Sequence, residues 1–164
     1  MKRAQIDAFC GCRETLYQRI VFFAAPAILL AGIVYVAVRY AQLPAEIPSH
    51  YNFYGEIDGY GSRGTLWITP VIGILCDALM LAVSFFPQTW NVGTSVTVFN
   101  RALVYRRVRD LIADMSLSTA VMFTAFAVWQ TALTPTFPWG MGVLIGVCCT
   151  APLVRFFVRL AMKK

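Results

Sequence analysis

Apolar residues occur in runs long enough to cross a membrane, and charged residues lie between these runs. The stretches 20–38 and 65–86 are 19 and 22 residues long, and the second contains a single charge, at Asp77. A third stretch, residues 115–154, contains no charged residue. Because an α-helix rises about 1.5 Å per residue, about 20 residues span a hydrocarbon core of about 30 Å. The pattern predicts a membrane protein.

A turn divides the third apolar stretch into two spans. The stretch is too long for one crossing, and residues 134–140 contain two prolines and a glycine, which favour a turn. We therefore predict an all-α fold, an integral membrane four-helix bundle that forms one domain over residues 1–164. The bundle has one structured external loop, residues 39–64, and a cytoplasmic amphipathic helix. The predicted spans cover about residues 20–38, 65–86, 112–133 and 138–160.

Basic residues lie almost entirely on one side of these spans. Of the 14 Lys and Arg residues, only Arg39 and Arg63 fall in the first loop between spans, and the last two are Lys163 and Lys164. Lys and Arg are retained in cytoplasmic segments, so both termini are predicted to be cytoplasmic. The retention of Lys and Arg at the membrane surface explains the net charge of +6. We therefore expect the lipid bilayer to be a partner and do not expect nucleic-acid binding.

The composition excludes several classes of protein. Hydrophobic residues make up 59% of the chain and charged residues 13%, with a mean hydropathy of +0.65. These values exclude a disordered tail, a coiled coil and an ordinary cytosolic enzyme. None of the five cysteines lies in an external loop, so structural disulfides are not expected. Cys10 and Cys12 are interpreted either as small residues in an unconstrained tail or as a site of metal binding or lipidation.

The segment of residues 97–114 combines a helical apolar stripe with basic residues. The stripe is formed by Val104, Val108, Leu111 and Ile112. We predict a cytoplasmic amphipathic helix that lies on the inner leaflet before the chain enters the third span, with a docking platform for a cytosolic regulator as the alternative. The basic residues predicted to face lipid headgroups are Arg101, Arg106, Arg107 and Arg109.

Asp77 lies near the middle of the second span. A carboxyl group at that depth costs about 2.5–3.5 kcal/mol on insertion scales, so we expect it to face protein or water. Its side chain serves either in an interhelical hydrogen bond or in the coupling of proton or ion transport. The possible hydrogen-bond partners on the third span are Ser116, Ser118, Thr119, Thr124 and Gln130.

The fourth span carries small residues at every fourth position. Gly142, Gly146 and Thr150 share one face of the predicted helix. Small residues let helix backbones approach closely within a membrane. The face can therefore pack within the chain or between copies, and a homo-oligomer formed through these three residues is one predicted assembly.

The first external loop is a long polar segment with several reactive side chains. His50, Asn52, Glu56 and Asp58 form a possible polar cluster, and glycines such as Gly55 permit turns between them. One interpretation is a structural loop in which these side chains bond the local backbone and His50 bonds a carboxylate. The alternatives are recognition of a ligand or peptide, and metal binding or acid–base catalysis.

The loop also carries a motif that resembles a known family. Residues 43–62 follow the pattern LPxxIPxHxNxxGExDGxGS, directly after the first predicted span. This pattern is similar to the signature of a bacterial membrane family of unknown function that includes the Sdp-type toxin-immunity and signalling proteins. The chain has Ile57 where the family often has proline, and Arg63 where a basic residue commonly follows the Gly-Ser pair.

The resemblance implies a multi-pass protein of the bacterial plasma membrane that senses or neutralises a secreted peptide toxin. Some relatives also sequester a cytosolic transcriptional repressor, and no enzymatic activity, cofactor or metal comes with the family. The positions that match the motif and become candidate recognition residues are His50, Asn52, Gly55, Glu56 and Asp58.

Two functions from different classes follow. The first is recognition of an extracellular peptide through the first loop, with no catalytic residues. The alternative is a small proton- or ion-coupled transporter, or a transporter subunit, that uses Asp77 as its protonatable group. A membrane-embedded hydrolase is disfavoured because the sequence contains no recognisable catalytic pair.

Overall fold

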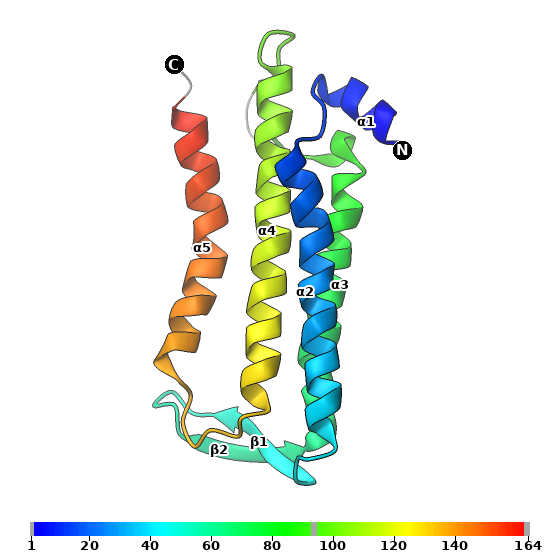
Figure 1. Ribbon diagram of the computed structural model, residues 1–164. Coiled ribbons are helices and arrows are strands. Elements are labelled where there is room, and N and C mark those ends of the chain that lie inside the picture. The colour runs from blue at the N-terminus through cyan, green and yellow to red at the C-terminus, as the bar shows by residue number, and fades with distance from the viewer. Residues whose placement is uncertain (1, 93–94, 163–164) are drawn as a thin grey trace.

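The computed structural model describes residues 2–92 and 95–162, and long helices dominate it (Figure 1). They are α2 (Leu16–Tyr40), α3 (Ile68–Ser84), α4 (Arg101–Gln130) and α5 (Trp139–Ala161). Each is long and apolar enough to cross a membrane, α3 together with the 3-10 helix η1 (Arg63–Trp67). The predicted all-α membrane bundle of four spans is confirmed, and the chain is a multi-pass membrane protein.

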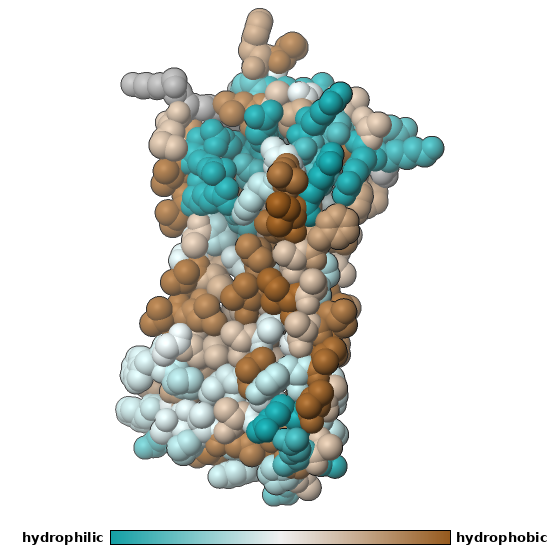
Figure 2. Space-filling view, viewed as in Figure 1, coloured by the Kyte–Doolittle hydropathy of each residue, from teal (hydrophilic) through white to brown (hydrophobic). Residues whose placement is uncertain are grey.

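The surface of the helices has the apolar character that lipid requires. Large apolar side chains such as Leu30, Leu75 and Val143 are exposed. Figure 2 shows apolar side chains around the middle of the molecule, between a strongly polar end and a paler end. Within the most apolar 18-residue stretch of α5, only 6% of the residues are buried within the protein. This belt is the expected surface of a bundle whose solvent is the hydrocarbon core.

Helix α4 is the centre of the bundle, and α2 and α3 pack closely against it. The two contacts use glycines: a Cβ built on Gly32 would lie 2.9 Å from Cγ2 of Thr124, and one built on Gly73 would lie 2.8 Å from Cβ of Phe123. Small residues thus set the spacing of α2 and α3 from α4.

Helix α2 starts at a capping box, in which the backbone N–H of Gln18 donates to the Thr15 hydroxyl at 3.2 Å.

Gly73→Ala is expected to lower the free energy of unfolding by about 1–3 kcal/mol, because the new methyl group overlaps Phe123. The matched control is Gly142→Ala, since a Cβ there meets nothing within 4 Å. The control keeps or slightly raises stability, because alanine favours helix more than glycine does. Thermal unfolding in detergent, followed by circular dichroism, measures both variants. Equal midpoints for the two variants would contradict close packing of α3 on α4.

The small-residue face of α5 makes no packing contact within the described part of the chain. A Cβ on Gly142 or Gly146 would meet nothing within 4 Å, and the Thr150 hydroxyl donates to the carbonyl of Gly146 in its own helix at 2.7 Å. Close packing of this face inside the chain, one of the two uses predicted for it, is wrong. A homo-oligomer through this face stays a prediction.

The two ends of the bundle differ in structure. Both ends of the described chain and the connection between α3 and α4, which contains the 3-10 helix η2 (Pro87–Thr89), lie at one end in Figure 1. The opposite end carries the strands β1 (Glu46–Tyr51) and β2 (Ile57–Ser62). Apart from Arg39 and Arg63, the basic residues described belong to segments at the end with the termini. Lys163 and Lys164, which contributed to the predicted orientation, lie outside the described residues.

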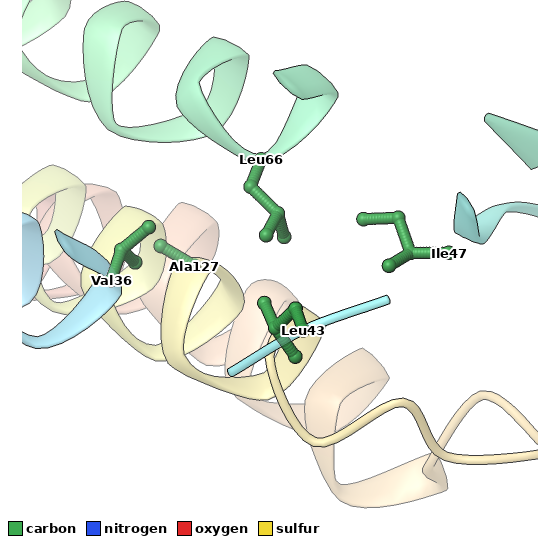
Figure 3. Close-up of a cluster of buried hydrophobic side chains, with 5 residues drawn as sticks. All are labelled: Val36, Leu43, Ile47, Leu66 and Ala127. Atoms are coloured by element: carbon green, nitrogen blue, oxygen red, sulfur yellow. The ribbon is translucent and has the colours of Figure 1, made fainter. Parts of the chain in front are cut away.

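The predicted external loop is an antiparallel β-hairpin, which an all-α description leaves out. Glu46 pairs with Ser62, Ile47 with Gly61 and Pro48 with Tyr60, and irregularities in register follow near His50. The hairpin is attached to the helices by a cluster of buried apolar side chains (Figure 3). The cluster consists of Val36, Leu43, Ile47, Leu66 and Ala127. Burial of Ile47, which is 1% exposed, holds β1 against the helix ends.

The N-terminal segment is folded, so its interpretation as an unconstrained tail is wrong. Helix α1 (Arg3–Cys10) ends at Gly11, whose φ of 68° is readily adopted only by glycine. Cys10 and Cys12 are buried against Ile6 and Tyr105. Burial raises the pKa of the Cys10 thiol to about 11 and also raises that of Cys12. Both thiols are therefore protonated near neutral pH, which disfavours metal binding and lipidation.

The segment of residues 97–114 differs from the predicted helix on the inner leaflet. From Arg101 onward it is the first part of α4, continuous with the membrane-spanning part. Its apolar stripe is largely buried within the protein, where Val104 is 2%, Val108 9% and Ile112 7% exposed. The same 3.6-residue period serves a helix lying on lipid and a helix packed on protein, so the sequence pattern alone did not distinguish them.

The prediction that four arginines of this segment face lipid is wrong for Arg109. Its side chain is buried and donates to the Asp7 carboxylate at 2.9 Å and to the Cys12 carbonyl at 3.2 Å. The guanidinium group of Arg101 lies over the ring of Phe9, 5.0 Å from its centroid. Arg106 is exposed and Arg107 is half-buried. Helix α1 supplies Asp7 and the segment after it supplies the Cys12 carbonyl, and neither contact was predicted from the sequence.

Candidate recognition site at the hairpin end

The hairpin and the connection between α4 and α5 form one structure. The backbone N–H of Phe137 donates to the carbonyl of Gly55 at 2.8 Å, and Glu56 forms a β-bridge with Thr136. Gly55 has a φ of 82°, which places it in the conformation that glycine adopts most readily. Segments some 80 residues apart in the sequence therefore build a single surface, seen at the end of the bundle opposite the termini in Figure 1.

His50 and Asp58 form the first pair of motif residues. The His50 Nδ1 lies 2.5 Å from Oδ1 of Asp58, and both side chains are exposed. The pair crosses the hairpin, because His50 lies opposite Gly59 in the register of the strands. The Asp58 carboxylate accepts a hydrogen bond from Nδ1–H of His50, so Asp58 orients the imidazole ring.

Asn52 and Glu56 form the second pair, and their contacts stabilise the turn. The Asn52 Oδ1 accepts from the backbone N–H of Tyr54 at 2.9 Å and of Glu56 at 3.0 Å. Its amide nitrogen donates to the Glu56 carboxylate at 3.1 Å. These bonds match the structural-loop interpretation, in which side chains bond the local backbone. Among the residues described, no three His, Cys, Asp or Glu side chains group closely enough to hold a metal ion.

An aromatic cluster that the sequence analysis missed lies beside His50. The ring of Trp129 on α4 is 5.3 Å from that of Tyr51, 5.0 Å from that of Phe137 and 5.2 Å from that of Phe126, measured between centroids. These distances are typical of attractive tilted and edge-to-face pairs. The only signal for the cluster in the sequence is the position of these aromatic residues in the motif and at the ends of two predicted spans.

The cluster and the hairpin enclose a pocket of about 210 Å³. Its wall consists of Pro48, Ser49, His50, Tyr51, Phe126, Trp129, Gln130 and Phe137. The Tyr51 hydroxyl donates to the Thr134 carbonyl at 3.0 Å, and Nε1 of Trp129 donates to the Thr134 hydroxyl at 2.9 Å. Partial burial raises the pKa of Tyr51, so its phenol is neutral under physiological conditions. The pocket is thus aromatic, with a polar rim.

Asp77 makes the interhelical hydrogen bond that was one of its two predicted roles. The Ser116 hydroxyl donates to its Oδ1 at 2.5 Å, and Asp77 is 5% exposed. Of the other predicted partners, Thr124 donates to the Ile28 carbonyl and Gln130 accepts from Thr69. Asp77 also lines an apolar cleft of about 340 Å³ between α2 and α3. The cleft wall includes Pro26, Leu29, Leu30, Ile33, Ile74 and Leu81.

The end of the bundle that carries the termini contains a polar ladder. Asp114 on α4 accepts hydrogen bonds from Tyr17 on α2 and Arg155 on α5. One turn earlier, Asp110 accepts from Gln18 on α2 at 2.8 Å and from Arg159 on α5 at 3.0 Å. The ladder connects three helices through two carboxylates, and the sequence analysis did not identify it.

Two comparisons with known proteins gave a match, one to a family and one to a single relative. Residues 27–74 match DUF1648, a domain of unknown function. The match runs from within α2 through the hairpin into α3, so it contains the whole motif of residues 43–62. An uncharacterized protein of Archaeoglobus fulgidus is 25% identical over 145 residues, covering 79% of each chain. No solved structure matches. The match confirms the resemblance to a domain of unknown function, and it does not extend to the Sdp-type proteins.

Proposed function

We propose that this chain is a plasma-membrane protein that senses or neutralises an extracellular peptide through its hairpin. The observation that carries the proposal is the pocket beside His50, because it joins a motif residue to aromatic rings from α4 and from the neighbouring connection. A concave apolar site with a few polar groups at its rim is typical of a binding site. In this proposal the hairpin is the part that meets the ligand and the helices support it.

The distribution of basic residues supports an external position for the hairpin. In the proposal both termini are cytoplasmic, as expected for the end that is rich in Lys and Arg. The resemblance of the motif to Sdp-type toxin-immunity and signalling proteins supports a secreted peptide as the ligand. A cytosolic repressor is the proposed second partner, on the side of the membrane that carries α1.

Protection from the peptide tests this proposal. Cells that express the chain are exposed to candidate secreted peptide toxins, including any that are encoded beside it, and survival is measured. His50→Ala and Asp58→Ala are expected to abolish protection while the amount of protein in the membrane stays unchanged. Glu46→Ala is the matched control, because Glu46 is exposed at the far end of β1. Full protection by the His50 and Asp58 variants would overturn the proposal.

Transport coupled to Asp77 is the second candidate function. The observation in its favour is that this buried carboxyl group lines the apolar cleft between α2 and α3. Ionisable groups within membrane spans commonly belong to transport pathways. In proteoliposomes with an imposed proton gradient, Asp77→Asn is expected to abolish proton-coupled flux and leave peptide binding intact. Loss of peptide protection without a change in flux would favour the first proposal.

A further inference from the structure

The pocket is lined by aromatic rings, and the polar atoms of Tyr51 and Trp129 are bonded within the protein. The Tyr51 hydroxyl and the Trp129 indole N–H are both bonded to Thr134, in the connection between α4 and α5. The rings are therefore oriented by the protein itself, and both side chains contribute to the pocket wall. The face of an aromatic ring carries partial negative charge, and tryptophan attracts cations most strongly.

Fixed charges near the pocket have the same sign as the ring faces. Asp58 is hydrogen-bonded to His50, which lines the pocket. Glu56 lies in the turn of the hairpin and forms a β-bridge with Thr136. The two arginines of the first loop are engaged elsewhere. Arg63 donates to the Leu43 carbonyl at 3.1 Å and stacks on Tyr40, and Arg39 donates to Gln42. The charge around the pocket thus favours a cation.

The size of the pocket limits what can enter. Sites for drug-sized ligands occupy roughly 300–1,000 Å³. The present pocket, at about 210 Å³, is below that range, so it is suited to one side chain and not to a folded peptide. Three polar side chains also line it, those of His50, Ser49 and Gln130, and the Gln130 Oε1 already accepts from Thr69.

We infer that this pocket binds a cationic side chain, lysine or arginine, of an extracellular peptide, held by Trp129, Tyr51 and Phe137 with His50 at the rim. The inference rests on the proposed function for the peptide itself and adds the chemistry of the residue that is recognised. The alkyl part of the side chain contacts the rings. The cationic end is attracted by the ring faces and by the nearby carboxylates of Asp58 and Glu56.

Two small probes test the inference on the purified full-length protein in nanodiscs. The first is the N-acetylated amide of lysine, and the second is that of norleucine, which has the same alkyl chain without the ammonium group. Binding is measured by saturation-transfer NMR. We expect the lysine amide to bind about tenfold more tightly than the norleucine amide, in line with a desolvated cation–π contact. Equal affinities, or no saturable binding of the lysine amide, would overturn the inference.

Variants of two tryptophans at the same end of the bundle locate the site. Trp129→Leu is expected to weaken lysine-amide binding about tenfold, whereas Trp139→Leu leaves it unchanged, because Trp139 is 90% exposed and does not line the pocket. Trp129→Phe keeps a ring in the cluster and is expected to retain the fold, with a smaller loss of affinity. Circular dichroism checks folding. An equal loss in both leucine variants would contradict the assigned site.

The inference and the proposed function fail in distinguishable ways. Selective binding of the lysine amide, together with unchanged protection in His50→Ala cells, would retain the cation pocket and overturn the proposed immunity function. Loss of protection in His50→Ala cells, together with equal binding of the two probes, would retain the proposed function and overturn the cationic ligand.

Discussion

Asp114→Asn is expected to lower the free energy of unfolding by about 3 kcal/mol, the low end of the range for breaking a buried ion pair. Asp114 is buried, and it accepts hydrogen bonds from Tyr17 and Arg155. The low end applies because the Arg155 side chain is 34% exposed and recovers part of its hydration. The Arg155 guanidinium also lies over the Tyr17 ring, 4.8 Å from its centroid, so the three side chains act as one unit.

The expected effect is large because α5 buries few of its own residues against α4. Only 6% of the residues in the most apolar 18-residue stretch of α5 are buried within the protein. In a membrane, contact between apolar helix faces gains little over contact with lipid, so polar contacts carry more of the association. The polar ladder of Asp110, Asp114, Arg155 and Arg159 supplies them.

Thermal unfolding in detergent, followed by circular dichroism, measures the Asp114→Asn variant. The double variant Asp114→Asn/Arg155→Met is expected to recover part of the loss, because it removes the unpaired cation. Arg13→Met is the control, since Arg13 is exposed at the same end of the bundle and its loss changes stability by about 0.5 kcal/mol at most. A midpoint for Asp114→Asn equal to that of the unmodified protein would contradict this role of the ladder.

The Cys10 thiol is expected to react with maleimide at least about 100-fold more slowly than an ordinary thiol at pH 7.4. Burial raises its pKa from 9.0 to about 11, and only the thiolate is the nucleophile. At a pH well below both pKa values, a pKa that is higher by about 2 lowers the thiolate fraction about 100-fold. The rate therefore continues to rise with pH up to about 11, where an ordinary thiol has already reached its plateau.

Mass spectrometry of modified peptides over time measures this rate. Phe99→Cys provides the reference thiol, because Phe99 is 100% exposed at the end of the bundle where α4 begins. Modification of Cys10 at the rate of that reference would show that α1 is not packed on α4 as described.

The membrane-spanning elements were predictable because each depends mainly on its own residues. Within a bilayer every backbone group must be bonded internally, so a long apolar run such as residues 20–38 has a helix as its only stable form. The boundaries were less predictable. Helix α4 begins at Arg101, 11 residues before the predicted start of the third span, because contacts with α1 bury a stretch that would otherwise suit the membrane surface.

The candidate site was predictable only in part. The motif identified His50, Asn52, Gly55, Glu56 and Asp58, and the structure brings His50 to Asp58 and Asn52 to Glu56. The aromatic wall of the pocket was not predictable. Trp129 is on α4 and Phe137 in the next connection, some 80 residues from Tyr51, and these rings meet only through tertiary contacts such as the Gly55–Phe137 hydrogen bond.

The amino-acid sequence by itself determined four apolar helices, the position of a structured loop between the first two, and the motif on that loop; the hairpin form of the loop came from the structure. Local length, hydropathy and turn residues are sufficient for these features. The tertiary structure alone decided which side chains face one another: Arg109 with Asp7, the ladder that attaches α5, and the rings around His50. These contacts join segments that are distant in the chain. A periodic pattern identifies which face of a helix is apolar, but it does not identify the segment that packs against that face.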